Sequence, residues 1–262
     1  MPTANNSFQV DRLEVQVYES QIQLVQDVAE ITRKYLQGTL EQKNNAAILF
    51  ATGNSQLEFL DLLTSLNDID WSQVTCFHLD EYLGIPANNS ASFGYYLYEK
   101  VEKKIKPKKF NYIQGDTLEP LMECQRYTDL LKAQPIDLCF LGIGKNGHLA
   151  FNEPLVADDC DPYLVKLVKL DPLNRQQQFE QGHFPSLESV PQYAFTLSIP
   201  MIFAAQKIIC FAMGTSKAEI IEKMLMGKIS KNCPASLLRN QVQGSLYLDK
   251  DAGKKLSNIM SP

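Results

Sequence analysis

The chain has 262 residues, of which 45% are apolar and 21% charged, and its formal net charge is −5. This usage is typical of a globular protein with a sizeable core, and it excludes a disordered or fibrous chain. The acidic balance argues against a general nucleic-acid binder, because affinity for phosphate backbones needs clustered lysine and arginine. No apolar run reaches membrane-spanning length and the first residues lack the regions of an export signal, so we expect a cytoplasmic protein without a membrane partner.

Short apolar runs alternate with amphipathic stretches of helical length along the chain. Runs without period-two alternation are typical of strands buried on both faces. We expect such strands at residues 46–51, 74–79, 136–143, 194–199 and 207–213. Helices are expected at residues 20–37, 55–66, 92–105, 121–132 and 216–227. This order predicts a single α/β domain over residues 1–262, with an open, mostly parallel, doubly wound sheet, helices on both faces and an irregular segment at 155–193 that could form a strand pair plus a mobile lid.

Four of the predicted strands are followed by turns rich in glycine and polar residues. In an open α/β sheet, ligands bind at the carboxyl ends of the strands, so we expect these turns to share one edge. They are ATGNS (51–55), LDEYLG (79–84), GIGKNGHLAFNEP (142–154) and MGTSKAE (213–219).

Two of these turns lead directly into predicted helices and can hold a phosphate group. In the first, backbone N–H groups and the hydroxyls of Thr52 and Ser55 would form the cradle. The second repeats this pattern and adds Lys217 as a cationic partner. Either turn taken alone is more often a simple helix cap. Neither matches the glycine-rich loops that bind nucleotides, so we expect no nucleotide cofactor.

The other two turns carry acid–base groups. Asp80 follows a buried strand, and partial desolvation would make it basic enough to abstract a proton beside a carbonyl, although a turn-capping role is the commoner one for such a residue. His148 precedes Glu153 by five residues, and this carboxylate could fix its tautomer for proton transfer. His78 is expected in the core or at an interface, and His183 on a surface loop or against substrate. No histidine pair has metal-ligand spacing, and the scattered cysteines are expected to be reduced, so we expect no metal.

Together these stretches resemble the glucosamine-6-phosphate deaminase/isomerase family, which shares its fold with the 6-phosphogluconolactonases. LDEYLG and GxGxNGHLAFNEP are the most specific stretches. The resemblance implies conversion of glucosamine 6-phosphate to fructose 6-phosphate and ammonia without a cofactor. It makes Asp80 the base that moves a proton between C2 and C1, His148 the group that opens the sugar ring, and Glu153 the carboxylate that orients His148.

The resemblance also assigns binding residues. Phosphate binding would fall to Thr52, Gly53, Asn54, Ser55 and Lys217, with Arg175 as the candidate arginine. Substrate contacts would fall to Glu81, Gly144 and Gly147. Asn146 is placed in the catalytic group, where some members have aspartate; it can orient a neighbour but cannot supply negative charge. The stretch LVADDCDPYLVKL (155–167) is acidic where allosterically regulated members of the family carry basic residues, so we do not expect a site for an allosteric activator.

Three other functions stay open from the sequence. The first is an isomerase/deaminase of galactosamine 6-phosphate, which differs from the glucosamine sugar at C4 alone. The second is a 6-phosphogluconolactonase, although such enzymes typically read DER and GHTASLFP where this chain reads DEY and GHLAFNEP. The third is a sugar-phosphate sensor, for which the residues before the first helix leave no room for a DNA-binding motif. A homo-oligomer is also left open.

Overall fold

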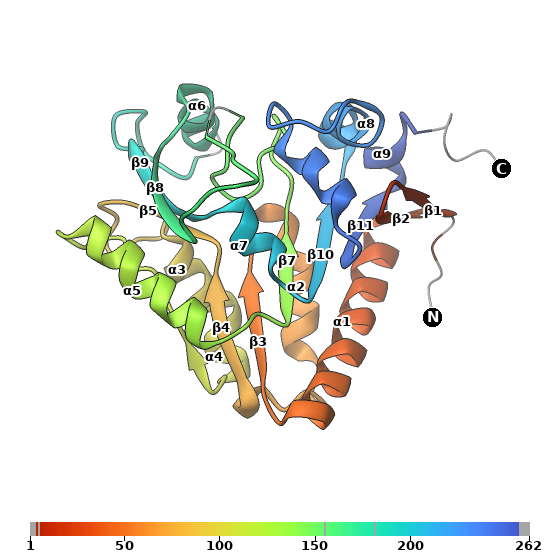
Figure 1. Ribbon diagram of the computed structural model, residues 1–262, viewed down its shortest axis with the longest axis horizontal. Coiled ribbons are helices and arrows are strands. Elements are labelled where there is room, and N and C mark those ends of the chain that lie inside the picture. The colour runs from red at the N-terminus through yellow and green to blue at the C-terminus, as the bar shows by residue number, and fades with distance from the viewer. Residues whose placement is uncertain (1–3, 5, 155, 181, 257–262) are drawn as a thin grey trace.

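The computed structural model describes residues 4, 6–154, 156–180 and 182–256 (Figure 1). Eight strands of this part form the main sheet, in the order β1-β2-β11-β10-β7-β3-β4-β6. Every paired neighbour whose register is given is parallel except β1 and β2, which are antiparallel. The strands are β1 (Asn6–Val10), β2 (Leu13–Tyr18), β3 (Ala46–Phe50), β4 (Val74–His78), β6 (Lys109–Phe110), β7 (Leu138–Leu141), β10 (Lys207–Ala212) and β11 (Gly244–Asp249).

A second, three-stranded sheet lies beyond the carboxyl edge of the main one. It contains β5 (Asp80–Tyr82), β9 (Tyr193–Leu197) and β8 (Val165–Lys169), paired in antiparallel fashion. The expectation that residues 194–199 form a strand of the parallel sheet is therefore wrong. Phe195 packs into the main core and Ala194 into a second apolar cluster, so both faces of β9 are covered and its sequence looks like that of a parallel strand.

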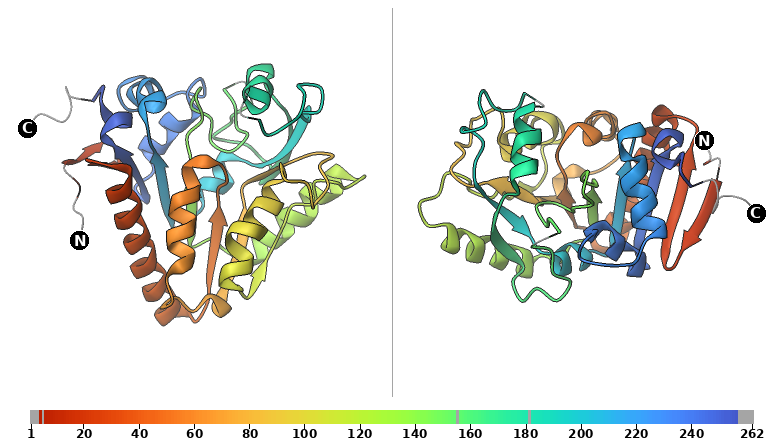
Figure 2. Two further views of the ribbon diagram at one scale, coloured as in Figure 1. Left: turned by 180° about the vertical axis from the view of Figure 1, so that it is seen from behind. Right: turned by 90° about the horizontal axis from the view of Figure 1, so that it is seen from above.

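Helices cover both faces of the main sheet, which confirms the doubly wound fold. One face carries α1 (Gln21–Lys43), α2 (Leu57–Ser65) and α3 (Phe93–Leu97), which continues through a π-helical turn into α4 (Lys103–Ile105); the other carries α5 (Pro120–Ala133) and α7 (Ile199–Phe203) (Figure 2). Above the carboxyl edge lies α6 (Pro172–Glu180). The remaining helices are α8 (Ala218–Met226) and α9 (Lys250–Gly253).

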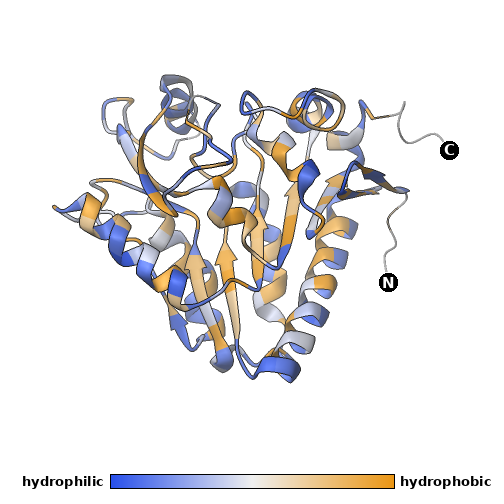
Figure 3. Ribbon diagram, in the orientation of Figure 1, coloured by the Kyte–Doolittle hydropathy of each residue, from blue (hydrophilic) through white to orange (hydrophobic). Residues whose placement is uncertain are grey.

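Apolar strands form the centre of the molecule, as the hydropathy colouring shows (Figure 3). The rings of Phe59, Phe140 and Phe211 meet edge to face between α2 and the sheet, with centroids 4.9 and 5.2 Å apart. His78 is fully buried at the end of β4, where its Nε2 accepts a hydrogen bond from the Ile113 N–H, as expected of a core histidine. No helix in the described residues is long and apolar enough to span a membrane.

The strand order creates a crevice at one place. From β3 the chain adds β4 and β6 on one side, whereas from β7 it adds β10 and β11 on the other. Loops that leave the carboxyl ends of β3 and β7 therefore diverge to opposite faces. Such a switch point is where open α/β sheets bind ligands.

Candidate active site

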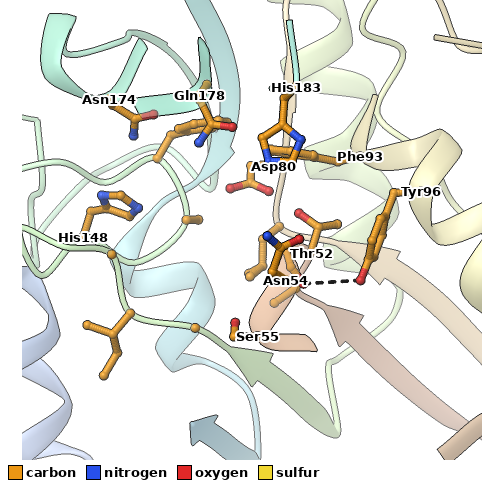
Figure 4. Close-up of a pocket in the computed structure, with 18 of the residues that line it drawn as sticks. Thr52, Asn54, Ser55, Asp80, Phe93, Tyr96, His148, Asn174, Gln178 and His183 are labelled. Atoms are coloured by element: carbon orange, nitrogen blue, oxygen red, sulfur yellow. Dashed lines mark hydrogen bonds between the residues drawn. The ribbon is translucent and has the colours of Figure 1, made fainter. Parts of the chain in front are cut away.

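A cavity of about 530 Å³ opens at this switch point. Its walls come from all four of the turns singled out in the sequence and from α6 (Figure 4). The candidate residues that line it are Thr52, Gly53, Asn54, Ser55, Asp80, Gly144, His148 and Lys217. The topology thus gathers side chains that are as much as 165 positions apart, the difference between 217 and 52, around one space.

Two turns with the same backbone geometry form one end of the cavity. Gly53 and Gly214 both have positive φ angles, of 102° and 85°, and each caps a 3₁₀ turn that runs into α2 or α8. Side chains with a Cβ rarely adopt these angles, so glycine is required at both positions. The turns start at the ends of β3 and β10 and aim helix N-termini at the cavity, which is favourable for an anion.

Lys217 supplies a positive charge between these turns. Its Nζ donates a hydrogen bond to the Ile143 carbonyl at 2.5 Å, which holds the ammonium group at the cavity wall. Burial, and secondarily the positive charge of Lys145, lowers the pKa of Lys217, so its charged form needs compensation by a negative charge. An anion beside it would supply that compensation.

Asp80 lies at the other end of the cavity, on β5 (Figure 4). Burial, and secondarily the negative charge of Glu81, raises the pKa of Asp80 from 3.8 to about 8. A carboxylate of this kind is a much stronger base than one in water. Its environment therefore suits proton abstraction from carbon, which needs a base with a pKa near the working pH.

Glu81 points away from the cavity, because successive side chains of a strand face opposite sides. Its carboxylate accepts hydrogen bonds from the Ser92 hydroxyl at 2.7 Å and from the N–H groups of Gly94 and Phe93 at 2.8 and 3.2 Å. It therefore anchors the N-terminus of α3 and does not line the cavity. Burial raises the pKa of Glu81, although these hydrogen bonds oppose the rise.

His148 belongs to a hydrogen-bonded network in the loop after β7. Its Nδ1 lies 2.8 Å from Asn146 Oδ1 and 3.1 Å from Glu153 Oε1. The Asn146 amide nitrogen donates to the other oxygen of Glu153. A carboxylate only accepts, so Asn146 must present its nitrogen to Glu153 and its oxygen to His148. Both neighbours of Nδ1 are then acceptors, which places the proton on Nδ1 and leaves Nε2 of the neutral ring as a base.

Glu153 and Gly144 both contact this histidine, whereas Gly147 packs against other residues. Burial raises the pKa of Glu153, but hydrogen bonds from His148, Asn146 and Asn174 outweigh that effect and the net pKa is lowered. The imidazole packs directly on Gly144, where any Cβ would lie 2.2 Å from the ring. Gly147 has a φ of 85° and does not line the cavity; a Cβ there would lie 2.8 Å from Cys233 Sγ.

Arg175, the candidate phosphate arginine, is not brought to the cavity. Its guanidinium donates to the carbonyl oxygens of Leu187, Val190 and Pro191 at 2.9, 2.7 and 3.1 Å. These bonds fasten α6 to the chain that follows it. The positive charge that the described residues place at the cavity comes instead from Lys217 and Lys145.

Several cavity residues were missed from the sequence. Asn174 and Gln178 lie one turn apart on α6 and face the cavity, and Tyr96 donates a hydrogen bond to the Gly53 carbonyl at 3.3 Å (Figure 4). His183, which is expected on a surface loop or against substrate, also lines the cavity. The stretch PLNRQQQFE does not reveal which face of α6 looks inward, because six of its nine residues are polar and no single face stands out.

One cluster of described residues offers three metal-ligand atoms within 4.8 Å, at Asp158, Asp159 and Cys160. Lys231 pairs with the two aspartates at 2.7 and 3.3 Å, so part of their charge is already neutralised. None of the three lines the cavity. They are unrelated to the acid–base groups.

The fold and the cavity are those of an α/β enzyme, with two turns suited to an anion at one end of the site and acid–base side chains at the other. The chain belongs to the family described as glucosamine-6-phosphate isomerases/6-phosphogluconolactonase, whose model matches residues 19–152. This confirms the resemblance inferred from the two motifs.

Individual relatives agree with this assignment. A glucosamine-6-phosphate deaminase of Bacillus cytotoxicus is 33% identical over 241 residues, which are 92% of this chain and 88% of that protein. One from Bacillus cereus (strain G9842) is 32% identical over 228 residues, 87% of this chain and 84% of that protein. The solved structure of a monomeric glucosamine-6-phosphate deaminase has a TM-score of 0.84 at 29% identity, covering 92% of this chain and 98% of that one. A 6-phosphogluconolactonase from Thermotoga maritima shares the fold, with a TM-score of 0.73 at 18% identity over 90% of this chain and 99% of that one.

Proposed function

We propose that this enzyme converts glucosamine 6-phosphate and water to fructose 6-phosphate and ammonia. The observation that carries the proposal is the placement of a basic carboxylate, Asp80, in the same cavity as the His148–Glu153 pair and two phosphate-type turns. The relatives at 32% and 33% identity bear the name of this activity. We also propose a cytoplasmic location, where sugar phosphates are found.

The phosphate end would hold the substrate by its fixed negative charge. The donors at this end include the N–H groups after Gly53 and Gly214, the hydroxyls of Thr52 and Ser55, the Asn54 amide and the Lys217 ammonium. Because charge-assisted hydrogen bonds are stronger than neutral ones, this end would provide much of the binding energy. Arg175 could join them only by giving up its bonds to backbone carbonyls.

The acid–base end would carry out the chemistry in two stages. His148 Nε2 takes the proton from the hydroxyl on C1 and returns it to the ring oxygen, which opens the pyranose to the aldehyde. Asp80 then takes the proton from C2 and delivers it to C1 through an enol-type intermediate, which leaves an imine at C2. Addition of water to that imine and loss of ammonia give the ketose. Glu153 stabilises the histidine while its ring carries the extra proton.

Ammonia release from the purified protein tests the proposal, with glucosamine 6-phosphate and galactosamine 6-phosphate in parallel and Asp80→Asn as the control. Turnover of the glucosamine sugar that the control lacks is the expected result. A preference for the galactosamine sugar in kcat/KM would replace the substrate but keep the reaction. Release from neither sugar, with hydrolysis of 6-phosphogluconolactone, would overturn the proposal in favour of the lactonase.

A further inference from the structure

Helix α6, which forms the roof of the cavity, contributes a side chain to the acid–base network. Asn174 lies on α6, and its Nδ2 donates a hydrogen bond to Glu153 Oε1 at 2.5 Å. This is the same oxygen that approaches His148 Nδ1. Figure 4 shows Asn174 above His148, on the opposite side of the cavity from Asn54 and Ser55.

The orientation of the Asn174 amide follows from the chemistry of its partner. Glu153 can only accept hydrogen bonds, so the amide must turn its nitrogen to Glu153 and its oxygen away. That oxygen, Oδ1, is buried and has no hydrogen-bond partner among the described residues. Asn174 is 8% exposed and lines the cavity. A buried acceptor without a partner in a cavity wall suits a donor that arrives with a ligand.

Among the described residues, Asn174 is also the side chain outside the loop after β7 that donates a hydrogen bond to Glu153. The other two donors to this carboxylate, His148 and Asn146, both lie in the segment that follows β7. His148 is the titratable group that acts on Glu153, whereas Asn146 and Asn174 are neutral amides. Without Asn174, nothing from the roof would hold Glu153 against the imidazole in the described structure.

We propose that Asn174 is a positioning residue that holds Glu153 against His148 from α6 and accepts, through Oδ1, a hydrogen bond from the bound amino-sugar phosphate. The second half of this proposal rests on the function proposed above, whereas the first half does not. The donor on the sugar is a hydroxyl or the ammonium group on C2, since these carry its polar hydrogens.

The first test needs no substrate. In protein labelled with ¹³C at the glutamate carboxyl groups, the Glu153 resonance is assigned by its loss in Glu153→Gln and followed against pH. In Asn174→Ala its titration midpoint moves to higher pH, because one donor to the carboxylate is gone. Gln176→Ala is the matched control: Gln176 is on the same helix and bonds to Glu180 rather than to Glu153. Equal midpoints in Asn174→Ala and the wild type would overturn the positioning role.

The second test uses a charge change at the same position. In Asn174→Asp the new carboxyl can donate to Glu153 only when the pair shares a proton, as closely spaced carboxyls do. Its kcat/KM is expected to fall at least about tenfold below that of the wild type at alkaline pH and to recover part of this loss as pH falls. A ratio to the wild type that stays constant over the pH range would overturn the proposal, because a merely structural defect has no reason to follow that proton.

Binding of sugar phosphates to catalytically inactive Asp80→Asn, with and without Asn174→Ala, tests the role of Oδ1. The second substitution is expected to weaken binding by about tenfold. A loss for both glucosamine 6-phosphate and glucose 6-phosphate assigns a hydroxyl to Oδ1, and a loss for the amino sugar alone assigns the ammonium. Unchanged binding of both overturns this half. If the wild type releases no ammonia, the proposed function fails by itself, and the ¹³C titration still decides the positioning role.

Discussion

Replacing Asp80 by asparagine is expected to abolish turnover and, at the same time, to stabilise the folded protein at neutral and alkaline pH. The folded-state pKa of Asp80 is about 8 and its ordinary value is 3.8. As pH rises between these values, the unfolded chain loses the proton while the folded protein keeps it. This difference lowers the stability of the wild type progressively until pH passes about 8, where the effect levels off. Asparagine does not titrate, so the stability of the variant does not fall with pH for this reason.

The size of the effect follows from the two pKa values. At 1.36 kcal/mol per pKa unit, a rise from 3.8 to about 8 corresponds to a ceiling of about 6 kcal/mol above pH 8. Asp80 lines a cavity that water can enter, so hydration of its carboxylate will make the stability difference between the variant and the wild type smaller than this ceiling. We expect Asp80→Asn to be more stable by ~1–3 kcal/mol above pH 8 and nearly equal to the wild type below pH 4.

Urea unfolding of both proteins at several pH values measures this difference directly, with the m-value as a check that the unfolded state is unchanged. Glu81→Gln is the matched control on the same strand. Each of its carboxylate oxygens accepts hydrogen bonds from two donors, and an amide nitrogen in place of one oxygen would face both of its donors. The free energy of unfolding of Glu81→Gln should therefore be lower than that of the wild type by ~1–3 kcal/mol. Parallel stability curves for the wild type and Asp80→Asn would refute the reasoning.

Three further outcomes are expected. Lys217→Ala should raise KM more than it lowers kcat, with weaker inhibition by inorganic phosphate; an effect on kcat alone would remove Lys217 from phosphate binding. Glu153→Gln should lower kcat by about 10²- to 10⁴-fold with little change in phosphate inhibition, and near-normal turnover would count against the histidine–carboxylate pair. The wild-type kcat/KM should rise with pH up to about 8, where Asp80 becomes ionised, and a profile that is flat from about pH 6 to 9 would contradict its role as the base.

The arrangement of the site was predictable where its residues lie in one stretch of sequence. His148, Asn146 and Glu153 lie within eight residues of one loop, and the loop follows a strand that its apolar run reveals. Their network therefore needed only the rule that ligands gather at the carboxyl ends of strands. The same rule predicted that Lys217, which follows a strand far away in the sequence, would lie at the cavity.

Side-chain direction was harder to predict. Glu81 was expected at the substrate, although the alternation of a strand turns it away once Asp80 faces the cavity. On α6, the family resemblance implied Arg175 as the phosphate arginine, yet the helix register points Asn174 inward and leaves the arginine to backbone carbonyls. A polar helix of this kind has no apolar stripe from which that register could be read.

The bonds of Arg175 have a consequence for how the cavity is entered. They join α6 to the carbonyls of residues 187–191, and Phe184 between them packs edge to face on Tyr82 at 5.5 Å. Arg175 thus ties α6 to the segment that follows it, and this unit is held to the rest of the molecule by the Phe184–Tyr82 contact and by the Asn174–Glu153 hydrogen bond, among others. A motion of α6 that widened the cavity would therefore break the Phe184–Tyr82 contact and the Asn174–Glu153 hydrogen bond together, so entry to the site and the positioning of Glu153 would be coupled.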